Sequence, residues 1–321
     1  MAGGRWPAAG RLQTGATGTG ACDQLPAAWE PVLQGKAVCI IGLGLMGGSL
    51  GMALRGKCHA VWGVARRVET VQAALDRGAI DFGTVDLGEG LRQADLAVLA
   101  VPVRAILALI PQVAPLLRPG AMVMDLGSTK AEVAAALEAG LPPGVQAIGG
   151  HPMCGKETSG LQWAQADLYR GKVFVLTPLQ RTTGEALALA EAMVQAAGAC
   201  PLVMDADRHD RLVAAISHLP YLESVALAEV AQEVARADTA VWQLSAAGFR
   251  DASRLAASDV TMMADILLTN RVNVSALARR AAQRLASLAQ SIEDADEPAL
   301  RQRMQAARDS VSSQRVTTEA T

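Results

Sequence analysis

One histidine of this chain lies in a segment whose composition suits proton transfer. His151 follows Gly149 and Gly150 and precedes Pro152, and the apolar stretch before them, residues 145–148, is typical of a short strand. A side chain on a tight loop at the carboxyl end of a strand lies where ligands bind in open α/β sheets. Imidazole is also the side chain best suited to move a proton near neutral pH. The segment therefore predicts a catalytic histidine.

A glycine-rich turn about one nucleotide-binding domain upstream indicates what the histidine works with. Gly42, Gly44 and Gly47 follow an apolar stretch at residues 37–41 and open a predicted helix. In a dinucleotide-binding turn, the first glycine permits the bend, the second lets a pyrophosphate approach the backbone, and the third lets the helix pack closely. We expect the cofactor to lie against a set of residues from this turn and from the end of a later strand: Gly42, Gly44, Leu45, Met46, Gly47, Val101 and Pro102.

The end of the next predicted strand, over residues 60–64, indicates which cofactor is bound. NAD enzymes usually place an acidic residue there, which holds the ribose 2′-hydroxyl. This chain instead has Ala65, Arg66 and Arg67, and two guanidinium groups could pair with a 2′-phosphate. We therefore expect NADP, with NAD possible. The alternative is that both arginines simply begin a solvated helix.

The elements that would position these residues follow a regular order. From residue 37, strand and helix patterns alternate, which is typical of a doubly wound parallel sheet. After residue 206 the pattern is helical throughout, and one long helix is predicted over residues 212–235. We expect an α/β fold with an N-terminal Rossmann-type doubly wound parallel sheet, followed by an all-helical domain that binds substrate and dimerises. The expected parts are a disordered N-terminal extension (1–35), a dinucleotide-binding domain (36–206), a helical domain (207–308) and a flexible tail (309–321).

Composition excludes several classes of function. The formal net charge of -2 provides no electrostatic attraction to nucleic acid or to an anionic membrane. No apolar run reaches the ~18 residues that span a bilayer. The five cysteines show no metal-ligand spacing, so we expect no metal site. A targeting peptide is the alternative for residues 1–35, since Arg5 and Arg11 are present and acidic residues are scarce. The segment has no clear apolar core of a secretion signal, and we expect a cytoplasmic protein.

Three further segments carry a family resemblance. They are residues 127–130, after a predicted strand, and residues 209–221 and 248–259 in the helical half. Together with the segment around His151, they resemble the prephenate/arogenate dehydrogenase family of tyrosine biosynthesis. The resemblance implies oxidative decarboxylation of a cyclohexadienyl acid. Hydride passes from the carbon that bears the ring hydroxyl to the nicotinamide, the hydroxyl proton is withdrawn, and the ring carboxylate leaves as carbon dioxide.

The resemblance also implies a role for each matched residue. His151 accepts the hydroxyl proton, and Ser128 touches the same hydroxyl and orients the histidine, unless it only caps a helix. Arg254 binds a substrate carboxylate in the cleft between the two domains. The other positions expected on the substrate side are Ser217, His218, Tyr221, Arg250 and Glu157. Arg250 could pair with Glu157 as a gate across the cleft, or the two could form an ordinary surface ion pair. We expect His209 and Asp210 to hold the domain junction.

Two departures from the family pattern leave the substrate open. Tyr221 stands where many prephenate-specific members have a second histidine, and Met262 and Met263 stand where many have a tryptophan. Prephenate dehydrogenase is the preferred interpretation, and an NADP-dependent arogenate dehydrogenase is the alternative. A β-hydroxyacid dehydrogenase would need a catalytic lysine in residues 212–235, which contain none. A non-catalytic NADP-binding regulator would have no need of His151.

Overall fold

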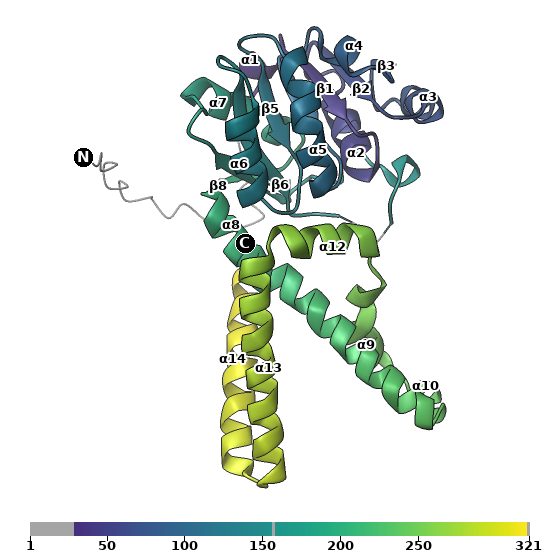
Figure 1. The fold of residues 1–321 in the computed structure, drawn as a ribbon, viewed down its shortest axis with the longest axis vertical. Coiled ribbons are helices and arrows are strands. Elements are labelled where there is room, and N and C mark those ends of the chain that lie inside the picture. The colour runs from purple at the N-terminus through teal and green to yellow at the C-terminus, as the bar shows by residue number, and fades with distance from the viewer. Residues whose placement is uncertain (1–28, 156–157, 320–321) are drawn as a thin grey trace, which may run out of the picture.

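An eight-stranded sheet forms the centre of the N-terminal half (Figure 1). The computed structural model describes residues 29–155 and 158–319. Its strands are β1 (Ala37–Ile41), β2 (Ala60–Val64), β3 (Phe82–Thr84), β4 (Leu96–Leu99), β5 (Met122–Asp125), β6 (Gln146–Pro152), β7 (Val173–Pro178) and β8 (Cys200–Val203). Their spatial order is β3-β2-β1-β4-β5-β6-β7-β8. Strands β1 to β6 run parallel, so their carboxyl ends meet along one edge, where ligands bind in such sheets.

Strands β7 and β8 depart from the all-parallel sheet that the sequence predicts. Strand β7 pairs with β6 in the antiparallel direction, and β8 then runs parallel to β7. The described part of the β6–β7 connection contains only the short 3-10 helix η2 (Leu161–Trp163). A parallel neighbour needs a crossover that returns the chain to the other end of the sheet. Here the chain turns back beside β6 instead, and the Rossmann-type arrangement is confirmed for β1 to β6.

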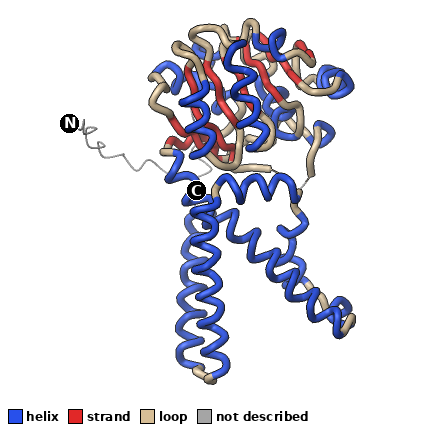
Figure 2. The backbone as a smooth tube through the Cα atoms, in the orientation of Figure 1, coloured by secondary structure: helices blue, strands red, loops and turns tan. Residues whose placement is uncertain are grey.

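Helices cover both faces of this sheet (Figure 2). They are α1 (Glu30–Leu33), α2 (Leu45–Leu54), α3 (Val68–Asp76), α4 (Leu87–Leu91), α5 (Val103–Val113) with the 3-10 turn η1 (Ala114–Leu116), α6 (Ala131–Gly140) and α7 (Gly184–Ala196). Successive residues of a strand point to opposite faces. Strand β1 accordingly sends Val38 and Ile40 into the core beneath α2 and α7, and Cys39 and Ile41 into the core beneath α5 and α6. Burial on both faces explains why the central strands are continuously apolar.

The sheet domain begins earlier in the sequence than predicted. Residues 1–28 of the expected extension lie outside the described residues, but residues 29–35 do not. Helix α1 places Leu33 in the core with no exposed surface, and Trp29 packs partly buried against the same core. The Lys57 ammonium lies 5.8 Å from the Trp29 ring centroid. These contacts attach residues 29–35 to the sheet domain.

The second half is helical and extends away from the sheet (Figure 1). Its elements are α8 (Ala206–Val213), the π-helical turn η3 (Ala214–His218), α9 (Leu219–Ala237), α10 (Ala240–Gln243), α11 (Ala247–Ser253), the 3-10 turn η4 (Arg254–Ala257), α12 (Val260–Thr269), α13 (Arg271–Glu293) and α14 (Glu297–Glu319). Helix α12 lies against the sheet domain, whereas α9 and the α13–α14 pair point away from it. Over residues 29–155 and 158–319, no helix is long and apolar enough to cross a membrane.

A π-helical turn interrupts the first long helix of this half. The sequence predicts one helix over residues 212–235, but α8 and α9 are separated by η3. Pro220 lies just after η3, at the second position of α9. Proline has no N–H to donate, and its ring clashes with the carbonyl four residues earlier, here that of Ile216. Widening the preceding turn is one way to relieve this clash, and π-turns are frequent at functional sites.

The end of the chain is not the flexible tail that the sequence predicts. Residues 309–319 continue α14, which packs against α13 as an antiparallel pair. The Arg303 guanidinium donates hydrogen bonds to the Ser287 hydroxyl (3.1 Å) and to the Arg284 carbonyl (3.2 Å) of α13. Support from a neighbouring helix explains why this polar segment is helical, because most helical stability in proteins comes from tertiary contacts.

Candidate active site

A cavity of about 1220 Å³ lies at the carboxyl ends of β1, β2 and β4. Its lining includes Gly42 and Gly44 after β1, and Val101 and Pro102 after β4. Helix α12 contributes Thr261 and Asp265 from the other side, so the cavity lies between the two halves of the chain. Asp265 also lies 3.5 Å from the Arg104 guanidinium of α5, which links the halves at this point.

The glycines of this cavity fit a dinucleotide. Gly42 has a φ of 103°, and a Cβ there would lie 2.5 Å from the Ala100 carbonyl oxygen, so only glycine suits the position. A Cβ on Gly47 would lie 1.9 Å from the Gly42 carbonyl oxygen. At Gly44, a Cβ would meet nothing within 4 Å, which leaves open space at the N-terminus of α2. Backbone N–H groups at such a terminus bind phosphate.

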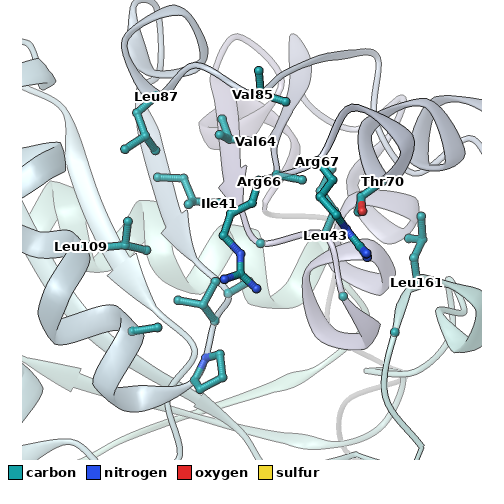
Figure 3. Close-up of a pocket in the computed structure, with 18 of the residues that line it drawn as sticks. Ile41, Leu43, Val64, Arg66, Arg67, Thr70, Val85, Leu87, Leu109 and Leu161 are labelled. Atoms are coloured by element: carbon teal, nitrogen blue, oxygen red, sulfur yellow. The ribbon is translucent and has the colours of Figure 1, made fainter.

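Two arginines and one acid surround the part of the cavity after β2 (Figure 3). Arg66 and Arg67 are exposed and line the cavity. In Figure 3 the Arg66 side chain points into the cavity and Arg67 lies beside Thr70. Glu69, in the first turn of α3, lines the same cavity. The sequence pattern does not predict this acid, because Glu69 lies beyond the end of β2, in the helix that follows.

His151 is the second-last residue of β6. The two glycines before it allow neighbouring groups to pack closely. A Cβ on Gly149 would lie 2.1 Å from the Thr177 hydroxyl oxygen of β7, and one on Gly150 would lie 2.7 Å from the Asp125 carbonyl oxygen of β5. Ser128 is half-buried in the loop after β5. Because β5 and β6 are parallel neighbours, Ser128 and His151 lie at adjacent strand ends.

His151 belongs to a hydrogen-bonded chain of three side chains. Its Nδ1 lies 2.8 Å from Nε2 of His209, and Nδ1 of His209 lies 2.8 Å from a carboxylate oxygen of Asp210. The same carboxylate accepts the backbone N–H groups of Lys130 (2.8 Å) and Ala131 (2.9 Å) at the start of α6. Asp210, rather than Ser128, therefore caps this helix. We expect His209 and Asp210 to hold the domain junction. In the structure, His209 in addition contacts His151 directly.

A buried ion pair lies beneath the loop that carries Ser128. The Lys130 ammonium contacts the Asp125 carboxylate, and both side chains are fully buried. Lys130 also donates to the Gly150 carbonyl oxygen (2.7 Å), and Asp125 accepts the backbone N–H of Gly127 (2.8 Å). The pair thus joins β5, the loop after it and the residue before His151. The sequence does not predict this ion pair, because an aspartate and a lysine five residues apart show no distinctive pattern.

Burial changes the acid–base behaviour of the histidines. Burial, together with the cationic forms of His209, Lys130 and His218, lowers the pKa of His151 well below its usual value near 6.5. Burial also lowers the pKa of His218 to about 4, although the Asp210 carboxylate opposes this shift. Both rings are therefore neutral at pH 7. A neutral imidazole can accept a proton, as a general base must.

The remaining residues expected at the substrate side fall into two groups. His218 is buried, and its Nδ1 lies 3.3 Å from the Asn270 amide nitrogen at the start of α13. Tyr221 is also buried and packs in one cluster with Met263 and Ile266. Two positions at which the chain departs from the family pattern are thus neighbours. Ser217, on η3, is exposed.

The arginine segment lies next to the helix that lines the cavity. Arg254 begins η4 and is exposed, and Arg250 is exposed on α11. Turn η4 is held to α9 by a hydrogen bond from the Ala256 backbone N–H to the Ser224 hydroxyl (2.8 Å). Glu157 lies outside the described residues, so its pairing with Arg250 stays a prediction.

Comparison with families and with curated proteins agrees with this geometry. The family model of the prephenate dehydrogenase nucleotide-binding domain matches residues 50–202, and that of the prephenate dehydrogenase dimerization domain matches residues 205–306. The prephenate dehydrogenase of Lactococcus lactis is 34% identical over 241 residues, and the cyclohexadienyl dehydrogenase of Zymomonas mobilis is 33% identical over 240 residues. Both alignments cover 73% of this chain. They span 65% of the Lactococcus protein, which is less than two thirds, and 81% of the Zymomonas protein.

Solved structures give a similar result. Prephenate dehydrogenase from Aquifex aeolicus, in complex with hydroxyphenyl propionate and NAD+, matches with a TM-score of 0.81 and 29% identity. The match covers 88% of this chain and 99% of the Aquifex chain. The arogenate dehydrogenase of Synechocystis matches with a TM-score of 0.75 and 29% identity, and covers 86% of this chain and 99% of its own.

Proposed function

Since the chain belongs to the prephenate dehydrogenase family, we propose that it catalyses the oxidative decarboxylation of prephenate to 4-hydroxyphenylpyruvate. The observation that carries the proposal is the position of His151, two strands along the sheet edge from the end of β4 that borders the cavity. A neutral base on the same edge of the sheet as the cavity supports this function. The nicotinamide cofactor, when bound, supplies the hydride acceptor.

The residues of the chain provide the proton transfer and the orientation. Nδ1 of His151 faces His209, so Nε2 is the nitrogen directed away and available to the substrate hydroxyl. Withdrawal of the hydroxyl proton helps the hydride leave the same carbon, and the loss of the ring carboxylate as carbon dioxide makes the ring aromatic. We propose that Ser128 bonds the same hydroxyl from the adjacent strand end, and that Ser217, His218 and Tyr221 contribute to the substrate side.

A turnover assay with two acids and two cofactors tests this function. Prephenate and arogenate are each supplied with NAD and with NADP, and the reduced cofactor and carbon dioxide are measured. Prephenate should give the higher kcat/KM. Higher values with arogenate would favour the second candidate, an arogenate dehydrogenase that forms tyrosine directly. The cluster of Tyr221 and Met263, where the chain departs from the prephenate-specific pattern, favours that candidate. Absence of turnover with both acids would reject both functions.

The two arginines after β2 lead us to propose NADP as the preferred cofactor, with NAD as the alternative. Both line the cavity, and the Arg66 side chain points into it. A 2′-phosphate could accept paired hydrogen bonds from such guanidinium groups, which a 2′-hydroxyl could not match. Glu69 in the same cavity could instead accept a bond from a 2′-hydroxyl, so the measured preference depends on which side chain the ribose meets.

Replacing both Arg66 and Arg67 with alanine should weaken NADP more than NAD. Each charge-assisted bond contributes about 1.5–3 kcal/mol, so the KM for NADP should rise by at least about tenfold, with little change for NAD. Steady-state kinetics with both cofactors measures this. Arg77→Ala is the matched control, because Arg77 lines the same cavity but donates to the Ala164 carbonyl (3.2 Å). Equal losses for the two cofactors in the double variant would argue against the proposal.

We propose that Arg254 binds a carboxylate of the substrate. It lies on η4, between α11 and α12, and α12 lines the cavity from the helical side. A guanidinium group pairs well with a carboxylate, which prephenate and arogenate both carry. Arg250 and Glu157 are also proposed to contribute to substrate binding.

The Arg254→Ala variant should show a much higher KM for the substrate. Losing one charge-assisted interaction of about 1.5–3 kcal/mol corresponds to an increase of about 10- to 100-fold. The dissociation constant for NADP should stay almost unchanged, since this side chain is expected to meet only the acid. Arg301→Ala serves as a control, because Arg301 pairs with Glu297 on the exposed surface of α14. Unaltered substrate saturation in Arg254→Ala would remove this residue from the binding site.

Exposed apolar side chains on the helical half support the proposal of a homodimer. Leu227, Val230 and Val234 are exposed on α9, at a spacing that places them on one face. Leu285 and Ile292 are exposed on α13. Apolar surface of this kind is typical of a subunit interface, and the matched family domain is described as a dimerization domain. A cytoplasmic location stays a prediction.

A further inference from the structure

We propose that His209 is a positioning residue that keeps the ring proton of His151 on Nδ1, so that Nε2 can accept a proton. The proposal deepens the function proposed above. It rests on that function only in taking the substrate hydroxyl as the group that gives its proton to His151. Its basis is the chain of side chains from His151 through His209 to Asp210, in which each link is 2.8 Å long. The sequence suggested only a junction role for the last two.

The Asp210 carboxylate fixes the direction of this chain. It accepts the backbone N–H groups of Lys130 and Ala131, which can only donate. These groups form the N-terminus of α6, where the helix dipole also favours a negative charge. The carboxyl oxygens of Asp210 therefore act as acceptors, and the nitrogen of His209 that faces them, Nδ1, must donate.

The tautomers of the two histidines then follow in order. A neutral imidazole has one donor nitrogen and one acceptor nitrogen. Because Nδ1 of His209 donates to Asp210, we infer that Nε2 of His209 serves as the acceptor, and the group facing that nitrogen is Nδ1 of His151. Nδ1 of His151 then carries the proton. Nε2 of His151 is left with its lone pair, which is the form that a general base requires.

The chain also helps His151 after it has taken a proton. Proton uptake at Nε2 makes an imidazolium whose Nδ1–H still donates to His209, while His209 still donates to Asp210. No bond of the chain has to be remade. His209 and Asp210 are each only 1% exposed, so water does not compete for these bonds and the interaction is strengthened. Burial opposes the protonation of His151, as do the cationic forms of His209, Lys130 and His218.

The tautomer can be measured without turnover. Protein labelled with 15N in its four histidines is prepared without cofactor, and the ring nitrogens are observed by NMR near pH 8. The His151→Asn variant assigns the His151 signals. Wild-type His151 should show a protonated Nδ1 and an unprotonated Nε2, and His209→Leu should shift it toward a mixture of tautomers. His59→Asn is the control, because His59 is exposed in a loop far along the chain from this site. A wild-type His151 protonated on Nε2 would overturn the proposal.

Kinetics separate positioning from a purely structural role. Removing a residue that orients a functional histidine typically costs about 10- to 100-fold in metal sites, and a similar loss in kcat is expected for His209→Leu. The KM for the acid and the dissociation constant for the cofactor should stay the same. His209→Gln should recover part of the kcat, because its amide oxygen can still accept from His151, and it replaces the leucine variant if that protein does not fold.

The outcomes distinguish this proposal from the proposed function. If wild type oxidises neither acid but shows the expected tautomer, the function is wrong and the positioning stands. If His209→Leu keeps full kcat, or loses cofactor affinity to the same degree as kcat, the positioning role is wrong whatever the substrate.

Discussion

The His151→Asn variant is expected to lose about two to four orders of magnitude in turnover, the range for removal of a general base. Asparagine can still bond a neighbour but cannot take up a proton at neutral pH. The dissociation constant for the cofactor should not change, because His151 does not line the dinucleotide cavity. Single-turnover and steady-state rates with the preferred acid, together with a cofactor titration, measure both effects.

The pH profile of the wild-type protein provides a check on the same residue. The pKa of His151 is lowered well below 6.5 in the folded protein. The neutral form therefore persists as the pH falls through 6.5, and kcat/KM should decline only at a lower pH. His59→Asn, which replaces an exposed histidine, should behave as wild type. Turnover near the wild-type rate in His151→Asn would exclude His151 as the proton acceptor.

Replacing Lys130 with methionine is expected to destabilise the protein by about 3–5 kcal/mol, the range for breaking one partner out of a buried ion pair. Both side chains of the pair are fully buried, so the Asp125 carboxyl group would be left buried without its cation. We expect the urea concentration at the unfolding midpoint to fall while the slope of the unfolding curve stays unchanged. The midpoint should fall because only the folded state buries the carboxyl group that has lost its partner.

A double variant tests the cause of this loss. Asp125→Asn combined with Lys130→Met leaves no unpaired charge, and an asparagine oxygen can still accept the Gly127 backbone N–H that Asp125 binds. The double variant should therefore be more stable than Lys130→Met alone. If Lys130→Met unfolds at the wild-type urea concentration, or if the second substitution adds a further full loss, the pair does not stabilise the fold in this way.

The sequence by itself determined the elements whose residues are buried or exposed in a regular pattern. Strands were correctly predicted over residues 37–41 and 60–64, because both are continuously apolar and lie in a sheet covered on both faces. The glycine turn after the first strand was recognisable because its conformation and close contacts require glycine. The switch to helices after residue 206 was also evident, since helical periodicity persists whatever the helices pack against.

Only the tertiary structure decided the features that depend on residues distant in sequence. The direction of β7, the π-turn before α9 and the helical end of the chain follow from neighbours that a local pattern does not include. The same holds at the candidate site: His151 and His209 are 58 residues apart, and Asp210 is 80 residues from the Lys130 backbone that it caps. Periodicity reports whether a side chain is buried, but a hydrogen-bonded chain requires the positions of all its members. The sequence could therefore suggest a base at His151, whereas only the fold brings His209 and Asp210 into a hydrogen-bonded chain with it.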